Sequence, residues 1–219
     1  MTWPCLSTGS TAVDALLGGY GVPQGHLTEL VGATMSGKTA LALQCAAAAA
    51  RAGHAVGIVD SCNGVSVERL HTALLAQGGR LDDLRRIRIV KAFDAPSFLA
   101  HLDAFALQQP PRLLVVDSAT ALIQPLNGGL DDKVGQAMAS HIVLCLREFA
   151  VSHNCAVVLT NSTLRGFDDD VQRPALGQWW THVPSVRIKL CGHDGNDGFV
   201  AKLDHSTLQH VDASRAAVF

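Results

Sequence analysis

Short runs of consecutive apolar residues alternate along most of this chain with longer segments in which apolar residues recur every three or four positions. The short runs predict strands that are buried on both faces, and the longer spacing predicts amphipathic helices. Strands are expected at residues 27–31, 55–60, 87–91, 112–117 and 155–160. Helices are expected from about Thr11 and at residues 40–52, 66–77, 95–108 and 134–152. This alternation predicts an α/β fold with a mostly parallel central sheet and helices on both faces.

The pattern changes beyond Arg173, where apolar strands at residues 186–190 and 199–203 follow each other without a helix between them. We expect these two strands to extend the sheet as an antiparallel edge. With 219 residues, of which 48% are hydrophobic and 16% charged, the chain suits a single compact domain. Its expected parts are a lead-in with a short helix at 1–26, a core at 27–190, and C-terminal edge strands with a tail at 191–219.

The segment between the first predicted strand and the next helix matches the phosphate-binding pattern G-x-x-x-x-G-K-[ST]. Its glycines allow backbone N–H groups to turn toward a phosphate, and the helix that follows adds the positive end of its dipole. Lys38 is expected to reach the β- and γ-phosphates, and Thr39 to place its hydroxyl on Mg²⁺. A glycine-rich turn without a ligand is the alternative. The expected ATP-binding residues are Gly32, Ala33, Thr34, Met35, Ser36, Gly37, Lys38, Thr39 and Ala40.

A second candidate is Asp117, which closes the apolar run Leu113-Leu114-Val115-Val116. Ligands of parallel α/β sheets gather at the carboxyl ends of the strands, so we expect Asp117 to bind Mg²⁺ beside Thr39. Many buried strands end in an aspartate that only starts a turn, which is the structural alternative. The phosphate-binding loop earlier in the chain favours the Mg²⁺ assignment.

Stretches around these residues resemble the RecA/RadA recombinase superfamily, in its eukaryotic Rad-fifty-one branch. They include the lead-in Leu6-Ser7-Thr8-Gly9, the segment Asp-Ala-Leu-Leu-Gly-Gly at 14–19 and Asp-Ser-Ala-Thr-Ala-Leu at 117–122. Residues 60–64 and 173–180 are similar to the paralogue type lettered D. The resemblance spans residues 6 to about 204, without the family's small N-terminal helical domain. It implies a RecA-like P-loop NTPase core that binds ATP and Mg²⁺ and acts in homologous-recombination repair of DNA.

The resemblance also implies roles for two residues outside the phosphate-binding loop. Residues 157–161 are similar to the family strand whose terminal amide senses the γ-phosphate, so Asn161 joins Lys38 and Asp117 as a candidate catalytic residue. Asp204 matches the family residue that caps a neighbouring subunit's nucleotide, although Ser206 stands where the family has a proline.

One departure from the family pattern concerns hydrolysis. Recombinases that hydrolyse ATP well place a glutamate just after the strand that follows the P-loop helix, whereas this chain reads Asp60-Ser61-Cys62-Asn63-Gly64 there. Loss of a positioned general base removes about 10²–10⁴-fold of rate. We therefore expect at most weak, DNA-dependent ATPase activity, with ATP acting mainly as a conformational clamp. Asp60 acting through a water molecule is the alternative base.

The family's two DNA-binding loops correspond here to residues 127–133 and about 162–173, and in both of them acidic residues outnumber basic ones. Phosphate neutralisation supplies most non-specific affinity for DNA, so we expect weak binding of single-stranded DNA by this chain alone. The expected role is an accessory or mediator subunit that assembles with other recombinase paralogues in the nucleus. A self-assembling DNA-dependent ATPase with strand-exchange activity is the alternative, and a P-loop kinase is a more distant one.

The remaining composition adds few constraints. The formal charge of -2 argues against a strongly basic DNA binder, and six cysteines without a CxxC pair indicate a reducing, intracellular compartment. We expect no signal peptide, no membrane span and no metal other than Mg²⁺. The adjacent Trp179 and Trp180, placed at the start of a strand, are expected to point to opposite faces. The arginines at 80, 85, 86 and 88 are interpreted as a solvated face, with a partner or DNA patch as the alternative.

Overall fold

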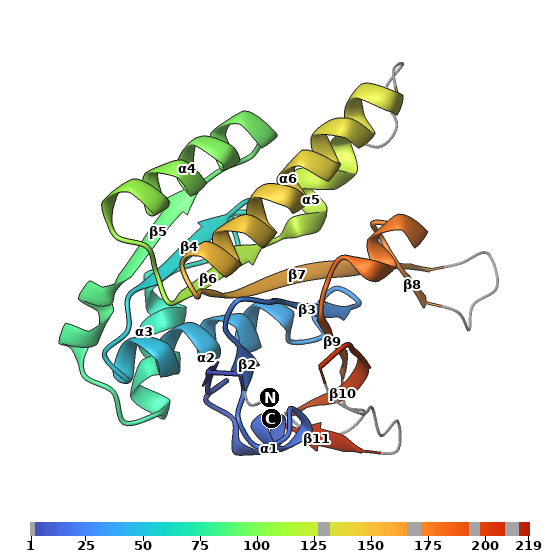
Figure 1. Cartoon of the computed structure of the whole chain (residues 1–219). Coiled ribbons are helices and arrows are strands. Elements are labelled where there is room, and N and C mark those ends of the chain that lie inside the picture. The colour runs from blue at the N-terminus through green and yellow to red at the C-terminus, as the bar shows by residue number, and fades with distance from the viewer. Residues whose placement is uncertain (1–2, 127–131, 166–171, 193–197, 209–214) are drawn as a thin grey trace.

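The computed structural model describes residues 3–126, 132–165, 172–192, 198–208 and 215–219. These residues form one large sheet and the helices that cover it (Figure 1). The strands of this sheet are β3 (Leu27–Gly32), β4 (Val56–Asp60), β5 (Ile87–Lys91), β6 (Leu113–Asp117), β7 (Ala156–Arg165), β8 (Gln172–Pro174), β9 (Val186–Gly192), β10 (Phe199–Ser206) and β11 (Ala216–Val218). Their order in the described residues is β11-β10-β9-β3-β7-β6-β4-β5, and β8 pairs with the end of β7. A separate antiparallel pair joins β1 (Cys5–Leu6) to β2 (Val22–Pro23).

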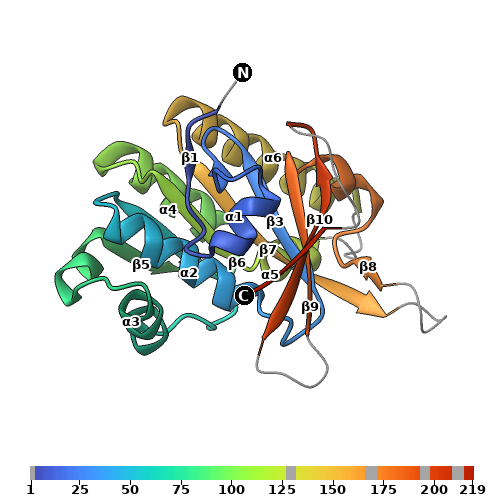
Figure 2. The same ribbon diagram turned by 90° about the horizontal axis from the view of Figure 1, so that it is seen from below.

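The helices form a layer on each face of the sheet. They are α1 (Thr11–Leu16), α2 (Lys38–Arg51), α3 (Val67–Ala76), α4 (Ala95–Gln108), α5 (Ala119–Ile123), α6 (Asp132–Ser152) and the 3₁₀ helices η1 (Leu81–Arg86), η2 (Gln124–Leu126) and η3 (Gln178–His182). Helices α1, α2 and α3 cover one face, and α4, α5 and α6 cover the other (Figures 1 and 2). No helix in the described ranges combines the length and apolarity that crossing a membrane requires.

Alternating strand residues explain why both faces are covered. Ile58 and Val115 pack in the cluster beneath α2, whereas their neighbours Val59 and Val116 pack in the cluster beneath α4 and α6. Because successive strand residues point to opposite faces, a continuously apolar strand needs a hydrophobic layer on each side. Helix α2 is itself buried over most of its surface, and the alanines at 46–50 are all buried. The predicted α/β fold is confirmed.

The C-terminal strands differ partly from the expectation. Strand β9 runs parallel to β3, so antiparallel pairing begins only at β10, which pairs with both β9 and β11. The predicted antiparallel edge is confirmed, because β9 and β10 pair antiparallel, while the join of this edge to β3 is parallel. Strands β1, β2, β8 and β11 and helix α5 were not predicted, because strands of two or three residues and a helix of five residues carry too little periodic pattern to recognise.

One local prediction is corrected. Trp179 and Trp180 lie in the 3₁₀ helix η3 and not at the start of a strand, although one of them is fully buried and the other is 40% exposed. Helix α1 begins at Thr11, as expected, after the cap Ser10, whose side chain accepts from the Val13 amide. Asp14 accepts hydrogen bonds from the Ser7 hydroxyl and from the amide and hydroxyl of Thr8, so it holds the lead-in against the helix.

Candidate functional site

The predicted phosphate-binding loop connects β3 to α2 at the carboxyl edge of the sheet. Two of its glycines are required by space: a Cβ at Gly32 would lie 2.4 Å from the Leu190 oxygen, and one at Gly37 would lie 2.6 Å from the Phe199 ring. Gly37 also has φ of +90°, a conformation that residues with a side chain rarely adopt. Between them, Met35 has a left-handed backbone and an 89% exposed side chain. The loop therefore presents its backbone to the site and turns its one large side chain outward.

Lys38 is the positive charge of this loop. Its Nζ donates hydrogen bonds to the carbonyl oxygens of Gly32 (2.8 Å) and Ala33 (2.6 Å), which hold the ammonium over the loop. Burial lowers the pKa of Lys38 below its ordinary value, while the negative charge of Asp117 acts in the opposite direction. A partly desolvated ammonium with only carbonyl partners is complementary to an incoming anion.

Thr39 and Asp117 meet as the sequence predicted. The Thr39 hydroxyl donates to Asp117 Oδ2 at 2.8 Å, and the Thr160 hydroxyl donates to the other carboxylate oxygen. Asp117 is only 3% exposed and lies beside Asp60 in the parallel pairing of β6 with β4. A hydroxyl and a carboxylate that face each other at the end of a parallel strand are the oxygen ligands that P-loop proteins give to Mg²⁺.

The turn after β4 lacks a free carboxylate. Asp60 Oδ1 accepts from the amides of Cys62 (3.2 Å) and Gly64 (3.1 Å), and Oδ2 accepts from the Val65 amide (3.2 Å). Asp60 is fully buried, and its carboxylate shapes the turn through these three backbone amides. This geometry disfavours Asp60 as the alternative general base.

Cys62 lies where this turn approaches Asp117, with its Sγ donating to the Asp117 carbonyl oxygen at 3.4 Å. Burial, followed by the charges of Asp117 and Asp60, raises the pKa of the Cys62 thiol to about 11. The side chain is therefore a neutral thiol at pH 7, which is a poor proton acceptor. The observed turn offers no group that is suited to activate water.

Comparison with known proteins shows the family of this chain. The sequence model of the Rad51 family matches residues 3–216 of the chain. The chain belongs to the Rad51 family. Among similar proteins, "DNA repair protein RAD51 homolog 4" of Mus musculus is 35% identical over 202 residues, which is 84% of this chain and 60% of that protein. The chain thus spans about three fifths of the length of this relative.

Other relatives come from archaea and bacteria. "DNA repair and recombination protein RadB" of Halobacterium salinarum is 35% identical over 193 residues, covering 84% of this chain and 80% of that protein. "Protein RecA" of Sinorhizobium medicae is 30% identical over 161 residues, covering 71% of this chain and 43% of that protein. These matches confirm the expected family, including its similarity to the D-type paralogue.

The Rad51-family loop of this chain fits the phosphates of a nucleotide. Ser36 Oγ is buried and has no hydrogen-bond partner within the described ranges, so it is a polar group that a phosphate oxygen could satisfy. Lys38, Thr39 and Asp117 supply the charge and the oxygen ligands. The donor set is thus suited to Mg²⁺ and a nucleoside triphosphate.

Two residues beside the loop were missed by the sequence analysis. A cavity of about 250 Å³ lies over the loop, and Arg69 and Phe199 line it together with residues 35–40. Arg69, on the first turn of α3, donates to the Gly64 oxygen at 2.6 Å. Phe199 begins β10 and covers Gly37. Neither position was recognisable from the sequence, because the contact of each with the loop is made only by the fold.

Asn161 occupies a different environment from the one implied for a γ-phosphate sensor. Its Nδ2 donates to Glu29 Oε1 at 2.7 Å, and its Oδ1 accepts from the Thr120 hydroxyl at 2.8 Å. Asn161 is fully buried, so its amide would have to exchange both hydrogen bonds to reach a phosphate. The sensor role stays a prediction.

The candidate DNA-facing segments are described only in part. Residues 127–131 and 166–171 lie outside the described residues, and so no geometry is assigned to them. Asp204 is exposed on β10, at a bulge between Leu203 and His205. Its role toward a neighbouring subunit's nucleotide also stays a prediction.

Proposed function

We propose that this chain binds ATP and Mg²⁺ and serves as an accessory subunit in homologous-recombination repair of DNA double-strand breaks. In this role it assembles with other recombinase paralogues, and nucleotide occupancy matters more than hydrolysis. Membership of the Rad51 family and the similarity to RAD51 homolog 4 and RadB support the DNA-repair assignment. The nuclear location is part of the proposal and rests on the mammalian relatives alone.

The chain's own residues supply the binding half of this function. The backbone of residues 32–37 and the Lys38 ammonium would contact the phosphates, and Thr39 and Asp117 would hold Mg²⁺. When bound, Mg²⁺ offsets the negative charge of the phosphates. A nucleotide at about a hundred times its Kd would stabilise the bound conformation by about 2.7 kcal/mol without being cleaved.

The observation that carries the clamp role is the turn after β4. Asp60 is held by three backbone amides, and Cys62 is a neutral thiol at pH 7. A site that binds a triphosphate without a positioned base is suited to hold ATP for long periods. Binding of single-stranded DNA is proposed to be weak for this chain alone and to depend on the assembled complex, because the candidate DNA-facing segments are rich in aspartate.

The test is capture of purified recombinase paralogues by the tagged chain, with Mg²⁺ and either ATP or a non-hydrolysable analogue. We expect both nucleotides to support capture equally and Lys38→Arg to weaken it, whereas the exposed control Lys202→Arg leaves it unchanged. Capture that needs hydrolysis, or that is indifferent to Lys38→Arg, would refute the clamp role.

Size-exclusion chromatography of the chain alone with ATP distinguishes the proposed accessory subunit from the alternative, a self-assembling ATPase. A mediator subunit elutes as a small species until a partner is added. Nucleotide-dependent filaments formed by the chain alone would instead indicate a self-assembling ATPase with strand-exchange activity.

A further inference from the structure

A second cavity lies at the far end of the sheet from the phosphate-binding loop. It measures about 330 Å³, and its lining includes Val56 at the start of β4, Arg88 on β5 and Phe105 on α4. Asp60, at the other end of β4, is about 13 Å away along the strand, at 3.3 Å per residue. The cavity is therefore separate from the nucleotide site and has no assigned role there.

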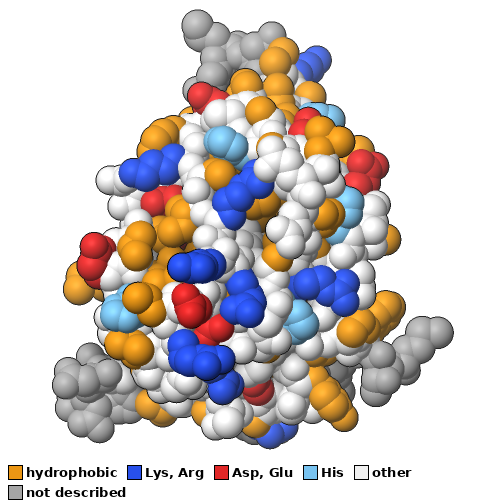
Figure 3. Space-filling view, turned by 90° about the vertical axis from the view of Figure 1, so that its left-hand side faces the viewer, with side chains coloured by type: hydrophobic (Ala, Val, Ile, Leu, Met, Phe, Trp, Pro, Cys, Tyr) orange, Lys and Arg blue, Asp and Glu red, His pale blue; other side chains and the backbone are white. Residues whose placement is uncertain are grey.

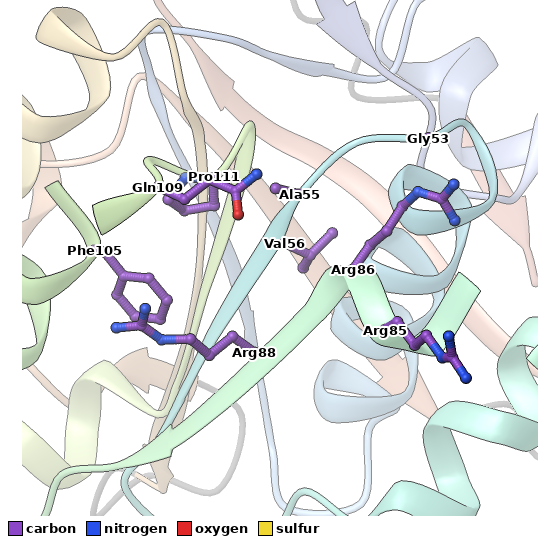
Figure 4. Close-up of a pocket in the computed structure, with 9 residues that line it drawn as sticks. All are labelled: Gly53, Ala55, Val56, Arg85, Arg86, Arg88, Phe105, Gln109 and Pro111. Carbon is purple, nitrogen blue, oxygen red and sulfur yellow. The ribbon is translucent and has the colours of Figure 1, made fainter. Parts of the chain in front are cut away.

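Arg88 is fixed at one wall of this cavity. Its guanidinium lies over the Phe105 ring, 4.3 Å from the centroid, and donates to Gln108 Oε1 at 2.6 Å. Phe105 is itself buried, so the ring on which the Arg88 guanidinium stacks is held in place by the core. Figure 4 shows Arg88 and Phe105 together on one side of the cavity, with Val56 and Arg86 across from them. Stacking on an aromatic ring orients a guanidinium before any ligand binds.

Arg88 also differs from its arginine neighbours in its charge partners. Arg85 pairs with Asp82 at 3.6 Å, and Arg86 pairs with Asp83 at 2.8 Å. No carboxylate within the described ranges lies within 4.0 Å of the Arg88 guanidinium. A guanidinium has five N–H donors, and the one hydrogen bond to Gln108 leaves most of them for a ligand. The cavity therefore presents a preoriented cation whose charge is not matched locally.

The charge balance points to a single carboxylate as the ligand. Nucleic-acid surfaces neutralise several phosphates at once with rows of basic residues. Here Arg85 and Arg86 each have an aspartate within 4.0 Å and do not form a row of unpaired cations, and basic and acidic side chains lie next to one another on this face of the molecule (Figure 3). The walls formed by Val56, Phe105 and Pro111 suit the methylene groups of an aspartate or glutamate side chain. An arginine fork and a carboxylate match in bidentate geometry.

We propose that this cavity binds an aspartate or glutamate side chain carried by a partner protein, with Arg88 as its main contact. The inference rests on the assembly part of the proposed function and names the chemistry by which a partner is recognised. It requires neither nucleotide hydrolysis nor a recombinase as the partner. Its failure is therefore distinguishable from failure of the proposed function.

The test is selection of binders from a random peptide library on the full chain with Mg²⁺ and ATP. We expect the selected peptides to share one fixed acidic position. Replacing that residue by its amide in a synthetic peptide should weaken binding at least about tenfold, or about 1.4 kcal/mol. This peptide comparison uses the wild-type chain and so needs no protein variant.

Protein variants then locate the contact. Arg88→Ala should abolish the acidic preference and Arg88→Lys should reduce it, because lysine keeps the charge but not the fork. Arg51→Ala is the control, because Arg51 is an exposed residue at the end of α2 that does not line the cavity. Thermal melts establish that each variant is folded.

Several outcomes would overturn the proposal. Peptides without a fixed acidic position would do so, and so would an acidic preference that survives Arg88→Ala. If a labelled oligothymidine bound in an Arg88-dependent manner and displaced the peptides, the surface would be a nucleic-acid site. If inorganic phosphate competed as strongly as the acidic peptide, the cavity would be a site for free anions.

Discussion

Glu29 and Arg187 form an ion pair inside the sheet, where they lie opposite each other in the parallel pairing of β3 with β9. Glu29 is fully buried and Arg187 is 5% exposed. The Glu29 carboxylate also accepts from Asn161 Nδ2 and Trp180 Nε1, each at 2.7 Å. Strand β3 leads directly into the phosphate-binding loop, so this cluster fixes the strand that positions the loop against β7, β9 and η3.

Glu29→Gln is predicted to destabilise the fold strongly. The substitution leaves the Arg187 guanidinium buried without a counter-charge, which typically costs about 3–5 kcal/mol. The matched control is Asp82→Asn, which removes a carboxylate from an exposed ion pair with Arg85 and should cost less than about 1 kcal/mol. Urea denaturation gives both free energies of unfolding. Equal values for the two variants would contradict the buried role of Glu29.

This cluster also shows what the sequence did not reveal. Glu29 stands out as one charged residue in an apolar run, but its partners Asn161, Trp180 and Arg187 lie more than a hundred residues away in the chain. Pairing of that kind depends on the strand order, which periodicity alone does not determine. Trp180 was further obscured because a 3₁₀ turn and the start of a strand look alike over two residues.

The nucleotide site was more predictable because its signals are local. The loop at 32–39 and the strand end at Asp117 each carry their pattern within a few residues, and the parallel sheet then brings Thr39 and Asp117 together. Arg69 and Phe199 reach the same site from α3 and β10 and could not be recognised in this way. The sheet core was likewise predictable from continuous apolar runs, whereas the direction of β9 was not.

Cys62→Glu is predicted to raise ATP turnover. The substitution places a carboxylate in the turn after β4, next to Asp117, where this chain has only a neutral thiol. Supplying a general base there should increase turnover on the order of 10²-fold. Asn63→Glu, one residue further along the turn, is the positional control, and the added Lys38→Ala substitution should abolish the gain. Steady-state phosphate release measures the rates. An equal gain from both glutamate variants would show that position 62 is not the specific place for the general base.

The reactivity of Cys62 should depend steeply on pH. Its pKa is raised to about 11, chiefly by burial, so only about one thiol in a thousand is ionised at pH 8. We expect the rate of alkylation by iodoacetamide to grow about tenfold per pH unit between pH 8 and 10, without a plateau. Mass spectrometry of the Cys62 peptide follows the reaction.

The Asp117→Asn variant tests whether the negative charge of Asp117 raises the pKa of Cys62. Asp117→Asn removes a negative charge that raises the Cys62 pKa, so the alkylation profile should move to lower pH. A wild-type rate that levels off before pH 10 would show that the thiol has an ordinary pKa. The neutral-thiol description of this turn would then be wrong.

The most direct test of the account is calorimetric titration of the folded chain with Mg²⁺ and a non-hydrolysable ATP analogue. The account predicts saturable binding to one site that is at least about tenfold weaker in Lys38→Ala, a loss of about 1.4 kcal/mol or more. Absence of binding to the folded wild-type chain, or binding that Lys38→Ala leaves unchanged, would contradict it.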